Sequence, residues 1–316
     1  MSAVDETVVA AAPRVLVLMA AYGGQRWIAE QLGSILAQRG VAVRVRVSDD
    51  RSHDGTADVV RELAGRDDRV SLVVRAESSG SAGANFRSLL ADADLSAADF
   101  VALSDQDDVW DSDHLVRGCE ALRARRGAGG YSCAVRTFGA GRASTLSQCG
   151  RARSLDHLFE GAGQGCSFVL TAELARRVQA ACRDLPAAVA ALHYHDWLIY
   201  VIARGASLDW IFDPRPGVSY RQHGANEIGA RSGAGAIRRR LRMIRSGWYK
   251  SQVRAASTIV RALGSLTPAH ARFDELFLAP PSLLRRLRLA ARLAFDGRRR
   301  LVDRGVLVWA ALAGWL

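Results

Sequence analysis

The sequence predicts an α/β protein built on a mainly parallel, twisted sheet that is flanked by helices. Over residues 14–104, short apolar runs typical of buried strands alternate with segments whose apolar residues recur at helical spacing. Polar and acidic residues follow several of these runs, and ligands bind at the carboxyl ends of the strands in such sheets. Hydrophobic residues make up 49% of the 316 residues, which is enough to bury a sizeable core.

The first half of the chain can be divided into elements in order. Val15 to Met19 form a continuous apolar run, ended by Gly23 and Gly24, that predicts a buried strand. Apolar residues then recur at helical spacing in the segment 28–38. The following elements are predicted as strand 41–50, helix 56–64, strand 70–74, helix 85–93 and strand 100–104. Strands that alternate with helices in this way form parallel sheets covered on both faces.

The second half of the chain has a weaker pattern. After Arg125 the sequence passes through GAGGYSC and FGAGRAS, and clear elements return as a strand near 166–170, a helix over 195–203 and a strand near 210–212. No linker precedes this half, so we expect it to belong to the same domain. The predicted divisions are an N-terminal extension over 1–13, a main domain over 14–229 and a basic, helical region over 230–316.

The net charge of +11 is concentrated at the C-terminus. Residues 231–316 contain 18 Lys plus Arg against 4 acidic residues, or +14, whereas residues 1–230 contain 25 against 28, or −3. Such a region suits an anionic partner. The alternative is that the excess reflects a chain that uses arginine in place of lysine throughout, because Lys250 is its only lysine. Because no run of aromatic residues for base stacking accompanies the basic region, an anionic membrane surface is favoured over nucleic acid.

One segment of this region, SLLRRLRLAARLAF, has the pattern of an amphipathic helix. Its predicted apolar face consists of Leu283, Leu287, Ala290, Ala291 and Ala294. Its other face carries Arg285, Arg288 and Arg292. The pattern fits a helix that lies in a membrane interface and, equally, a solvated helix packed on its own domain.

The remaining features predict a cytoplasmic protein, with peripheral contact to the inner face of the plasma membrane. The longest uncharged apolar run, residues 305–316, is shorter than the roughly 20 residues that span a bilayer. The N-terminus has no pattern of a signal peptide. The five cysteines form no CxxC pair, which favours a reducing compartment.

The stretch LSDQDDVW places Asp105, Asp107 and Asp108 directly after a predicted strand. Crowded carboxylates repel one another unless a cation or a row of donors compensates them, and Mg²⁺ and Mn²⁺ favour oxygen ligands. The spacing of Asp105 and Asp107 allows both side chains to face the same side of an extended turn. Helix capping explains the acidic residues of 111–113 better than it explains these two. The chain contains neither GxGxxG nor a P-loop, so those phosphate-binding motifs do not account for this edge.

Five ordered motifs over residues 14–229 together resemble the family 2 glycosyltransferases with the GT-A fold, particularly the rhamnosyltransferase-like members. These motifs are AAYGG, VSDDRSHDGT, LSDQDDVWDSDHL, HDW and YRQHGANEIG. The resemblance implies a Rossmann-like nucleotide-binding half and an acceptor-binding half. It also implies that a nucleotide sugar binds with Mg²⁺ or Mn²⁺, and that an acceptor hydroxyl displaces the nucleotide with inversion at the sugar carbon.

The resemblance implies donor-binding roles for residues in the first three motifs. Ala20 and Tyr22 belong to a loop that packs against the nucleotide base, and Asp50 bonds to that base. Asp105 lies on the metal side of the donor, and Asp108 lies beside the sugar hydroxyls.

The resemblance also implies which residues bind the metal and which residue accepts the acceptor's proton. Asp107 is the more direct metal ligand, with help from Asp105 and His223, and Arg221 contacts phosphate. Asp196 of HDW is the catalytic base that accepts a proton from the acceptor hydroxyl. Two alternatives stay open: Asp196 also suits the start of the helix that follows, and His223 suits an ordinary hydrogen-bonding role.

The predicted reaction is metal-dependent, inverting transfer of a sugar from a nucleoside diphosphate. The first expected donor is dTDP-L-rhamnose, with a UDP-hexose second, and the expected acceptor is a cell-surface polysaccharide or a lipid-linked glycan. The two alternatives are a sugar nucleotidyltransferase and a nucleic-acid-binding protein that uses the basic region.

Overall fold

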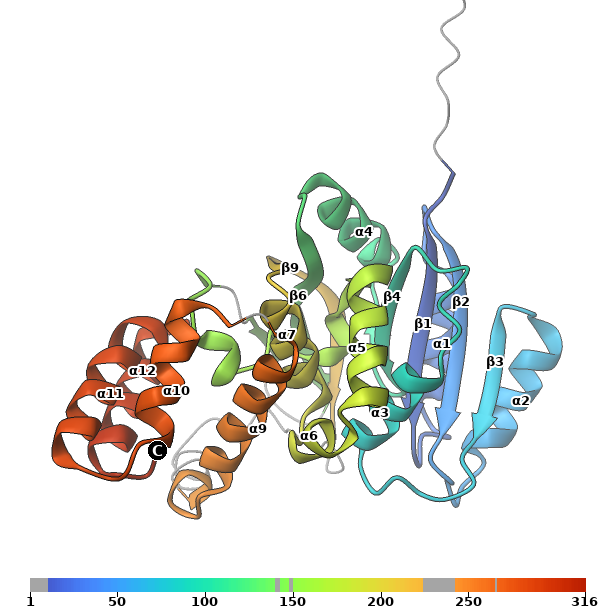
Figure 1. Ribbon diagram of the computed structural model, residues 1–316. Helices are drawn as coiled ribbons and strands as arrows, with labels where there is room; N and C mark the ends of the chain where they lie inside the picture. Colours follow the sequence, from blue (N-terminus) through green and yellow to red (C-terminus); the bar gives the residue numbers. More distant parts are fainter. Residues whose placement is uncertain (1–10, 140–142, 148–149, 224–241, 265) are drawn as a thin grey trace, which may run out of the picture.

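The computed structural model describes residues 11–139, 143–147, 150–223, 242–264 and 266–316, and places one nine-stranded sheet at their centre (Figure 1). The strand order is β3-β2-β1-β4-β8-β6-β9-β5, and β7 pairs with β6. The strands are β1 Arg14–Ala21, β2 Ala42–Asp49, β3 Val70–Val74, β4 Phe100–Asp105, β5 Val109–Trp110, β6 Ala128–Gly139, β7 Ser144–Leu146, β8 Val169–Thr171 and β9 Asp209–Gln222.

Helices cover both faces of the sheet, which confirms the predicted α/β class (Figure 1). The longer helices are α1 Ile28–Leu36, α2 Thr56–Arg66, α3 Ala82–Asp92, α4 His114–Ala124, α5 Ala172–Asp184, α6 Pro186–Ala191, α7 His195–Gly205, α9 Trp248–Ala262, α10 Pro268–Leu278, α11 Leu283–Asp296 and α12 Leu301–Leu312. Two short 3₁₀ turns, η1 Asp156–Leu158 and η2 Gly165–Ser167, lie between β7 and β8.

The first half of the chain follows the sequence prediction closely. β1, β2, β3 and β4 are mutually parallel, and their core residues separate into two clusters on opposite faces of the sheet. In β1, Leu18 belongs to the cluster shared with α3, α5 and α7, whereas Val17 and Met19 belong to the cluster shared with α1 and α4. A strand buried on both faces reads as a continuous apolar run, which is why this sequence predicts it well.

The second half differs from the prediction at its strands. The strand expected near 166–170 is the turn η2 followed by β8, and the strand expected near 210–212 is the start of the 14-residue β9. β6, a 12-residue strand that pairs with β9, was not predicted because Gly129 and Gly130 interrupt its pattern. A Cβ at residue 130 would lie 2.2 Å from the ring of Trp210, so the glycine is needed for these two strands to pack.

The C-terminal helices pack against the main body of the chain. α9 lies against α6 and α7, and Phe273, Leu289 and Leu307 share a core cluster with residues of α7. The predicted faces of α11 need correction, because Arg285 is buried and its guanidinium donates to carbonyls at the end of α10. None of the described helices is long and apolar enough to cross a membrane.

A buried ionic network joins the segment between α11 and α12 to the main body. Arg299 is 6% exposed, and its guanidinium donates to Asp156 at 3.2 Å and to the carbonyl of Gly161 at 2.6 Å. Its backbone N–H donates to the Glu160 carboxylate at 2.6 Å. Tyr200 of α7 donates to the same Asp156 oxygen at 3.0 Å. The C-terminal region therefore supports the segment 156–161 and, through it, the helix α7.

Replacing Arg299 should destabilise the protein strongly. Arg299→Met leaves Asp156 buried without its cation and leaves Glu160 with Arg298 as its one remaining arginine among the described residues, and we expect the free energy of unfolding to fall by about 3–5 kcal/mol. Denaturant unfolding of the purified variant measures this loss. The matched control is Arg300→Met, since Arg300 is exposed, and its change should stay within about 0.5 kcal/mol. Equal losses in both variants would contradict the role of the buried network.

Candidate active site

Three parallel strands bring acidic residues to one edge of the sheet. The register pairs Ala20 of β1 with Asp105 of β4, and Ala21 of β1 with Asp49 of β2. The carboxyl ends of β1, β2 and β4 are therefore adjacent, as expected for parallel strands. The loops that follow these strands carry most of the candidate donor-binding residues.

Gln106 holds the loop after β1 against the loop after β4. Its side-chain oxygen accepts from the backbone N–H of Tyr22 at 2.7 Å, and its side-chain nitrogen donates to the Tyr22 carbonyl at 2.7 Å. The Tyr22 side chain is exposed and lines an open pocket of about 330 Å³ with residues 51, 53, 77 and 78. Tyr22, which is predicted to pack against a nucleotide base, thus lines a pocket large enough for a base. No sequence pattern indicated this role of Gln106.

Asp50 is buried and organises the loop that precedes α3. One carboxylate oxygen accepts from the backbone N–H of Ser79 at 2.6 Å, and the other accepts from the hydroxyls of Ser79 and Ser78 at 2.9 and 3.2 Å. These bonds fix the serine loop at the edge of the pocket that Tyr22 lines. The hydrogen bond from Asp50 to a nucleotide base stays a prediction.

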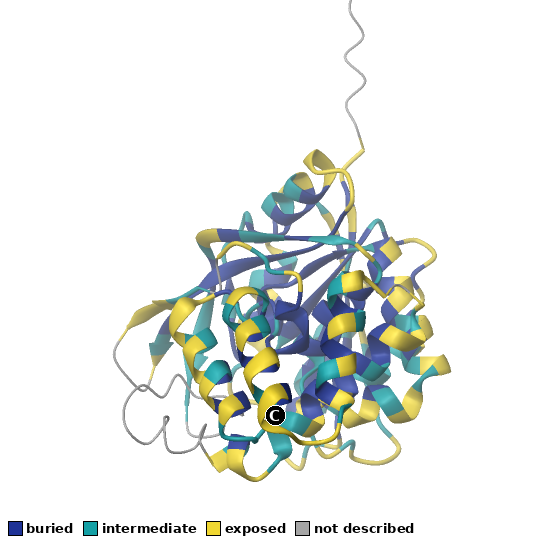
Figure 2. Cartoon of the chain, turned by 60° about the vertical axis from the view of Figure 1, so that its left-hand side comes forward, coloured by how far each residue is buried: buried dark blue, intermediate teal, exposed yellow. Residues whose placement is uncertain are grey.

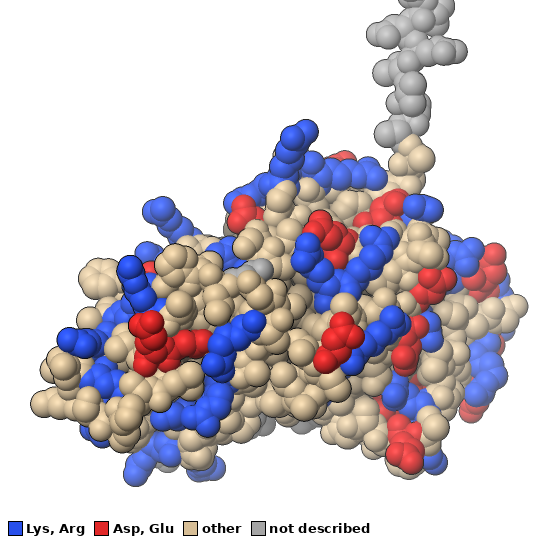
Figure 3. Space-filling model, viewed as in Figure 1, with Lys and Arg blue, Asp and Glu red and all other residues tan. Residues whose placement is uncertain are grey.

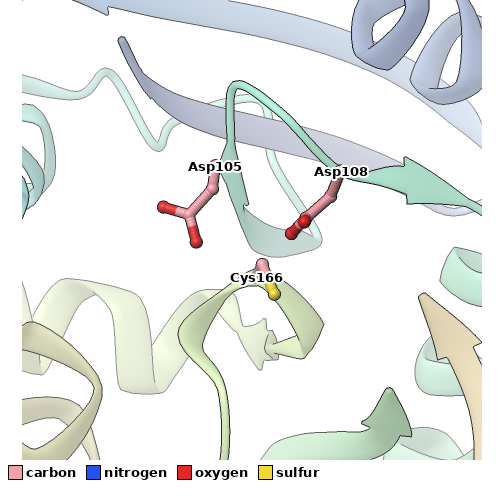
Figure 4. A group of neighbouring side chains, drawn as sticks. All are labelled: Asp105, Asp108 and Cys166. Atoms are coloured by element: carbon pink, nitrogen blue, oxygen red, sulfur yellow. The ribbon is translucent and has the colours of Figure 1, made fainter. Parts of the chain in front are cut away.

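The carboxylates after β4 separate into two groups. Asp105, Asp108 and Cys166 form the first, with potential ligand atoms that lie within 4.8 Å of one another (Figure 4). Asp108 is fully buried, and burial together with the Asp107 carboxylate raises its pKa to about 7. Burial raises the pKa of the Cys166 thiol well above its usual range, so the thiol stays protonated. The sequence pattern gave no reason to place Cys166 beside these acids.

Asp107 points to a different partner. Its carboxylate is hydrogen-bonded to Nε2 of His223 at 2.5 Å, and the imidazole stacks on Trp27 with ring centroids 4.4 Å apart. The sequence interpretation paired Asp105 with Asp107 on one side of the turn, whereas the structure groups Asp105 with Asp108. The assignment of Asp105, Asp107 and His223 as metal ligands stays a prediction.

Arg221 connects the two groups from β9. Its backbone N–H donates to Asp108 at 3.0 Å, and its guanidinium donates to the Asp107 carbonyl at 2.8 Å and to Glu30 at 2.6 Å. The guanidinium also lies over the ring of Phe138, 4.5 Å from its centroid. Arg221 thus holds residues 105–108, which we call the acidic loop, in place. This role adds to its predicted contact with phosphate.

The start of α7, which carries Asp196, lies close to the same edge. Asp196 lies in the first turn of α7, where its carboxylate accepts from the backbone N–H of Trp197 at 2.6 Å. The preceding His195 stacks on Phe86 and contacts η2 so closely that a Cβ at Gly165 would lie 2.5 Å from its Nε2. Gly165 directly precedes Cys166 in the chain. The short turn η2 therefore lies between the start of α7 and the group of Asp105, Asp108 and Cys166, which we call the acidic group.

The start of α7 also packs closely against the start of α3. A Cβ at Gly83, in the first turn of α3, would lie 2.6 Å from the carbonyl of His193. Desolvation lowers the pKa of His195 to about 3, so its imidazole is neutral at physiological pH. The serine loop, α3, α7, η2 and the acidic loop thus follow one another around a single edge of the sheet.

The acidic group fits a divalent cation. Oδ2 of Asp108 is buried and has no hydrogen-bond partner among the described residues, although a buried carboxylate oxygen is normally paired. The nearby oxygen donors are carboxylates, the ligands that Mg²⁺ and Mn²⁺ prefer. A cation at this position would compensate both the unpaired oxygen and the repulsion between Asp107 and Asp108.

Sequence comparison decides the family. The sequence profile described as "Glycosyltransferase like family 2" matches residues 13–177. The dTDP-rhamnosyl transferase RfbG of Shigella flexneri is 31% identical over 236 residues, which cover 74% of this chain and 82% of RfbG. The chain belongs to glycosyltransferase family 2. It is a glycosyltransferase, and the nucleotidyltransferase and nucleic-acid-binding alternatives are set aside.

Solved structures share the fold of this family 2 glycosyltransferase at low sequence identity. S. aureus TarS 1–349 in complex with UDP-GlcNAc superposes with a TM-score of 0.52 and 13% identity, covering 89% of this chain and 80% of TarS 1–349. The mannosyltransferase PcManGT from Pyrobaculum calidifontis, in complex with GDP-Man and Mn²⁺, gives 0.51 and 19%, covering 96% and 87%. Both likenesses confirm the predicted GT-A fold.

Proposed function

We propose that this glycosyltransferase is metal-dependent and inverting, and that it moves L-rhamnose from dTDP-rhamnose to a hydroxyl of a cell-surface polysaccharide or lipid-linked glycan. The observation that supports the proposal is the contact between His195, at the start of α7 beside Asp196, and Gly165, which directly precedes Cys166 of the group with Asp105 and Asp108. The similarity to RfbG over most of both chains supports dTDP-rhamnose as the donor.

Asp196 is the proposed base. A carboxylate in the first turn of a helix is stabilised in its ionised form by the helix dipole, so Asp196 is ready to accept a proton. As the acceptor oxygen bonds to the sugar carbon, its proton passes to Asp196. The bond between that carbon and the diphosphate oxygen breaks, and its electron pair leaves with the nucleoside diphosphate.

The acidic loop binds the donor on the other side of the sugar. Asp105, Asp107 and His223 are the proposed ligands of Mg²⁺ or Mn²⁺, which would neutralise the charge that develops on the departing diphosphate. Asp108 lies beside the sugar hydroxyls in this arrangement. Ala20, Tyr22 and Asp50 bind the nucleotide end, and Arg221 contacts phosphate while it holds the acidic loop.

A donor panel tests the proposal. The protein is mixed with Mn²⁺ and with dTDP-rhamnose, UDP-GlcNAc, UDP-glucose or GDP-mannose, and thermal unfolding and release of the nucleoside diphosphate are measured. We expect dTDP-rhamnose to stabilise the protein most, by about 2.7 kcal/mol at 100 times its dissociation constant. Preference for a UDP sugar would reject dTDP-rhamnose as the donor, but it would still agree with the proposal that the protein transfers a sugar. No response to any nucleotide sugar would overturn the proposal as a whole.

We also propose a cytoplasmic enzyme that works at the inner face of the plasma membrane. A lipid-linked acceptor would be present at that face while the glycan is being built. The basic C-terminal region suits the anionic lipids of that face.

A further inference from the structure

The last helix, α12, presents an apolar face away from the protein. Leu301 and Val302 are 73% and 81% exposed, and Val306, Trp309 and Leu312 are exposed on the same side. With Gly305, these are all the exposed residues of α12, so its outer face carries no charge. The opposite side is buried through Leu307, Ala310 and Ala311. A helix of a soluble domain normally turns polar residues outward, whereas α12 has apolar residues on both its buried and its exposed sides.

The neighbouring helix α11 extends this apolar surface. Leu283 and Phe295 are 73% and 71% exposed, and Leu284, Leu287 and Ala291 are exposed between them. Residues 283, 287, 291 and 295 are each four positions apart, so they form a stripe along one side of the helix. The buried side of α11 is formed instead by Leu289, Ala290 and Leu293. α11 packs directly on α12, and exposed stripes run along the helices near the C-terminus in Figure 2.

We name the exposed apolar residues of the two helices the α11–α12 face. It consists of Leu283, Leu284, Leu287, Ala291, Phe295, Leu301, Val302, Val306, Trp309 and Leu312. These include nine of the thirteen large hydrophobic side chains that are exposed in the described part of the chain. The face lies at the end of the molecule opposite β3, and away from the edge that binds the donor (Figure 1).

The surroundings of the face are basic. Among the exposed and half-exposed residues of the segment 268–312 there are seven arginines and three acidic residues, because Arg285, Arg299 and Asp274 are buried. Arg288 is exposed and lies one helical turn from Leu284, at the margin of the stripe. Basic side chains outnumber acidic ones at this end of the molecule in Figure 3. The face therefore combines exposed apolar side chains with flanking positive charge.

Three binding partners of the α11–α12 face can be compared: a second copy of the chain, nucleic acid and an anionic bilayer. A second copy of the chain would bring together two surfaces that each have an excess of arginine over acidic residues, at a cost in charge repulsion. Nucleic acid would satisfy the arginines and leave the leucine, valine and tryptophan side chains without an apolar partner. The surface of an anionic bilayer suits both the apolar side chains and the arginines. The apolar side chains enter the acyl boundary, and the arginines contact the lipid phosphates.

We propose that the α11–α12 face docks the enzyme on an anionic lipid bilayer, with both helices lying along the membrane surface. The inference deepens the proposed membrane location by naming the surface responsible, and it makes no use of the donor or the metal. Vesicle binding measured without nucleotide sugar therefore tests it separately from sugar transfer. Docking through α11 and α12 would leave the donor edge accessible from the aqueous side.

Cosedimentation of the full chain with vesicles is the experiment. One set of vesicles contains phosphatidylglycerol and phosphatidylethanolamine, and the other contains phosphatidylcholine alone. We expect binding to the anionic vesicles, weakening as salt is raised, and little binding to phosphatidylcholine. Val302→Gln should weaken the binding about ten-fold, because a polar side chain replaces one that enters the acyl boundary. Arg288→Gln should weaken it about five-fold.

Matched controls come from the opposite end of the molecule. Val74→Gln, at the end of β3, and Arg61→Gln, in α2, make the same substitutions at exposed positions and should leave vesicle binding unchanged. Circular dichroism and thermal unfolding check that each variant is folded. Binding that is absent, or that all four substitutions weaken equally, would overturn the proposal. So would a dimer in analytical ultracentrifugation that Val302→Gln dissociates, with no binding to vesicles.

Discussion

Asp196→Asn should lower the rate of sugar transfer by about 10²–10⁴-fold, the usual contribution of a positioned general base. Asparagine keeps the size of the side chain and an oxygen that can accept from the Trp197 backbone N–H, so α7 should still begin at the same place. What is lost is the ability to take the acceptor proton. The loss should appear in kcat with the acceptor, while the KM for the nucleotide sugar changes little.

The control for this variant is Asp58→Asn, which removes a carboxylate from the first turn of α2. Both substitutions remove the same favourable interaction with a helix dipole, worth about 0.3–1 kcal/mol. If Asp196 served only the start of α7, the two variants would lose similar stability and both would keep their activity. Full transfer by Asp196→Asn would therefore reject the assignment of the base.

The first half of the chain could be predicted from sequence because its signals are local. A parallel strand buried on both faces is a continuous apolar run, and β1 and β4 have this pattern. The second half depends on contacts between distant segments. β6 is a strand because its glycines admit the side chains of Leu208 and Trp210, about 80 residues later, and no local pattern reveals that.

The candidate site shows the same division. The sequence placed acidic residues at the ends of β2 and β4, where the parallel register brings them together. It did not reveal which carboxylates face one another, because that depends on the turn after β4. The contacts of Gln106 with Tyr22, and of Cys166 with Asp108, join loops that only the folded chain brings together.

The C-terminal region was predicted as basic and helical, and the sequence left open whether its amphipathic segment lies on a membrane or packs on its own domain. Arg299 belongs to a run of arginines that suggests a solvated surface, yet it is buried against Asp156 and Glu160. In α11 the apolar side chains are divided between a buried side and an exposed side. Hydrophobic periodicity identifies such a helix, and it does not say which of two apolar sides faces the protein.

Asp107→Asn should weaken binding of Mn²⁺ at least ten-fold and lower the rate of transfer by about 10²-fold. The substitution keeps the shape of the side chain and a polar contact with His223, and removes one negative charge from the acidic loop. Removing that charge reduces the attraction for the cation and the neutralisation of the departing diphosphate. Calorimetric titration of Mn²⁺ in the presence of dTDP, together with transfer rates over a range of Mn²⁺ concentrations, measures both effects.

Asp113→Asn is the matched control, because Asp113 lies six positions further along the chain at the start of α4 and its side chain makes no capping bond. It removes the same charge from a nearby, half-exposed position, so a general effect of net charge would affect both variants. A ligand role requires that only Asp107→Asn shift the Mn²⁺ dependence, and that high Mn²⁺ partly restore its rate. Should Asp107→Asn bind Mn²⁺ as the unmodified protein does, the ligands would have to be sought in the Asp105–Asp108 group, where an unpaired carboxylate oxygen lies buried.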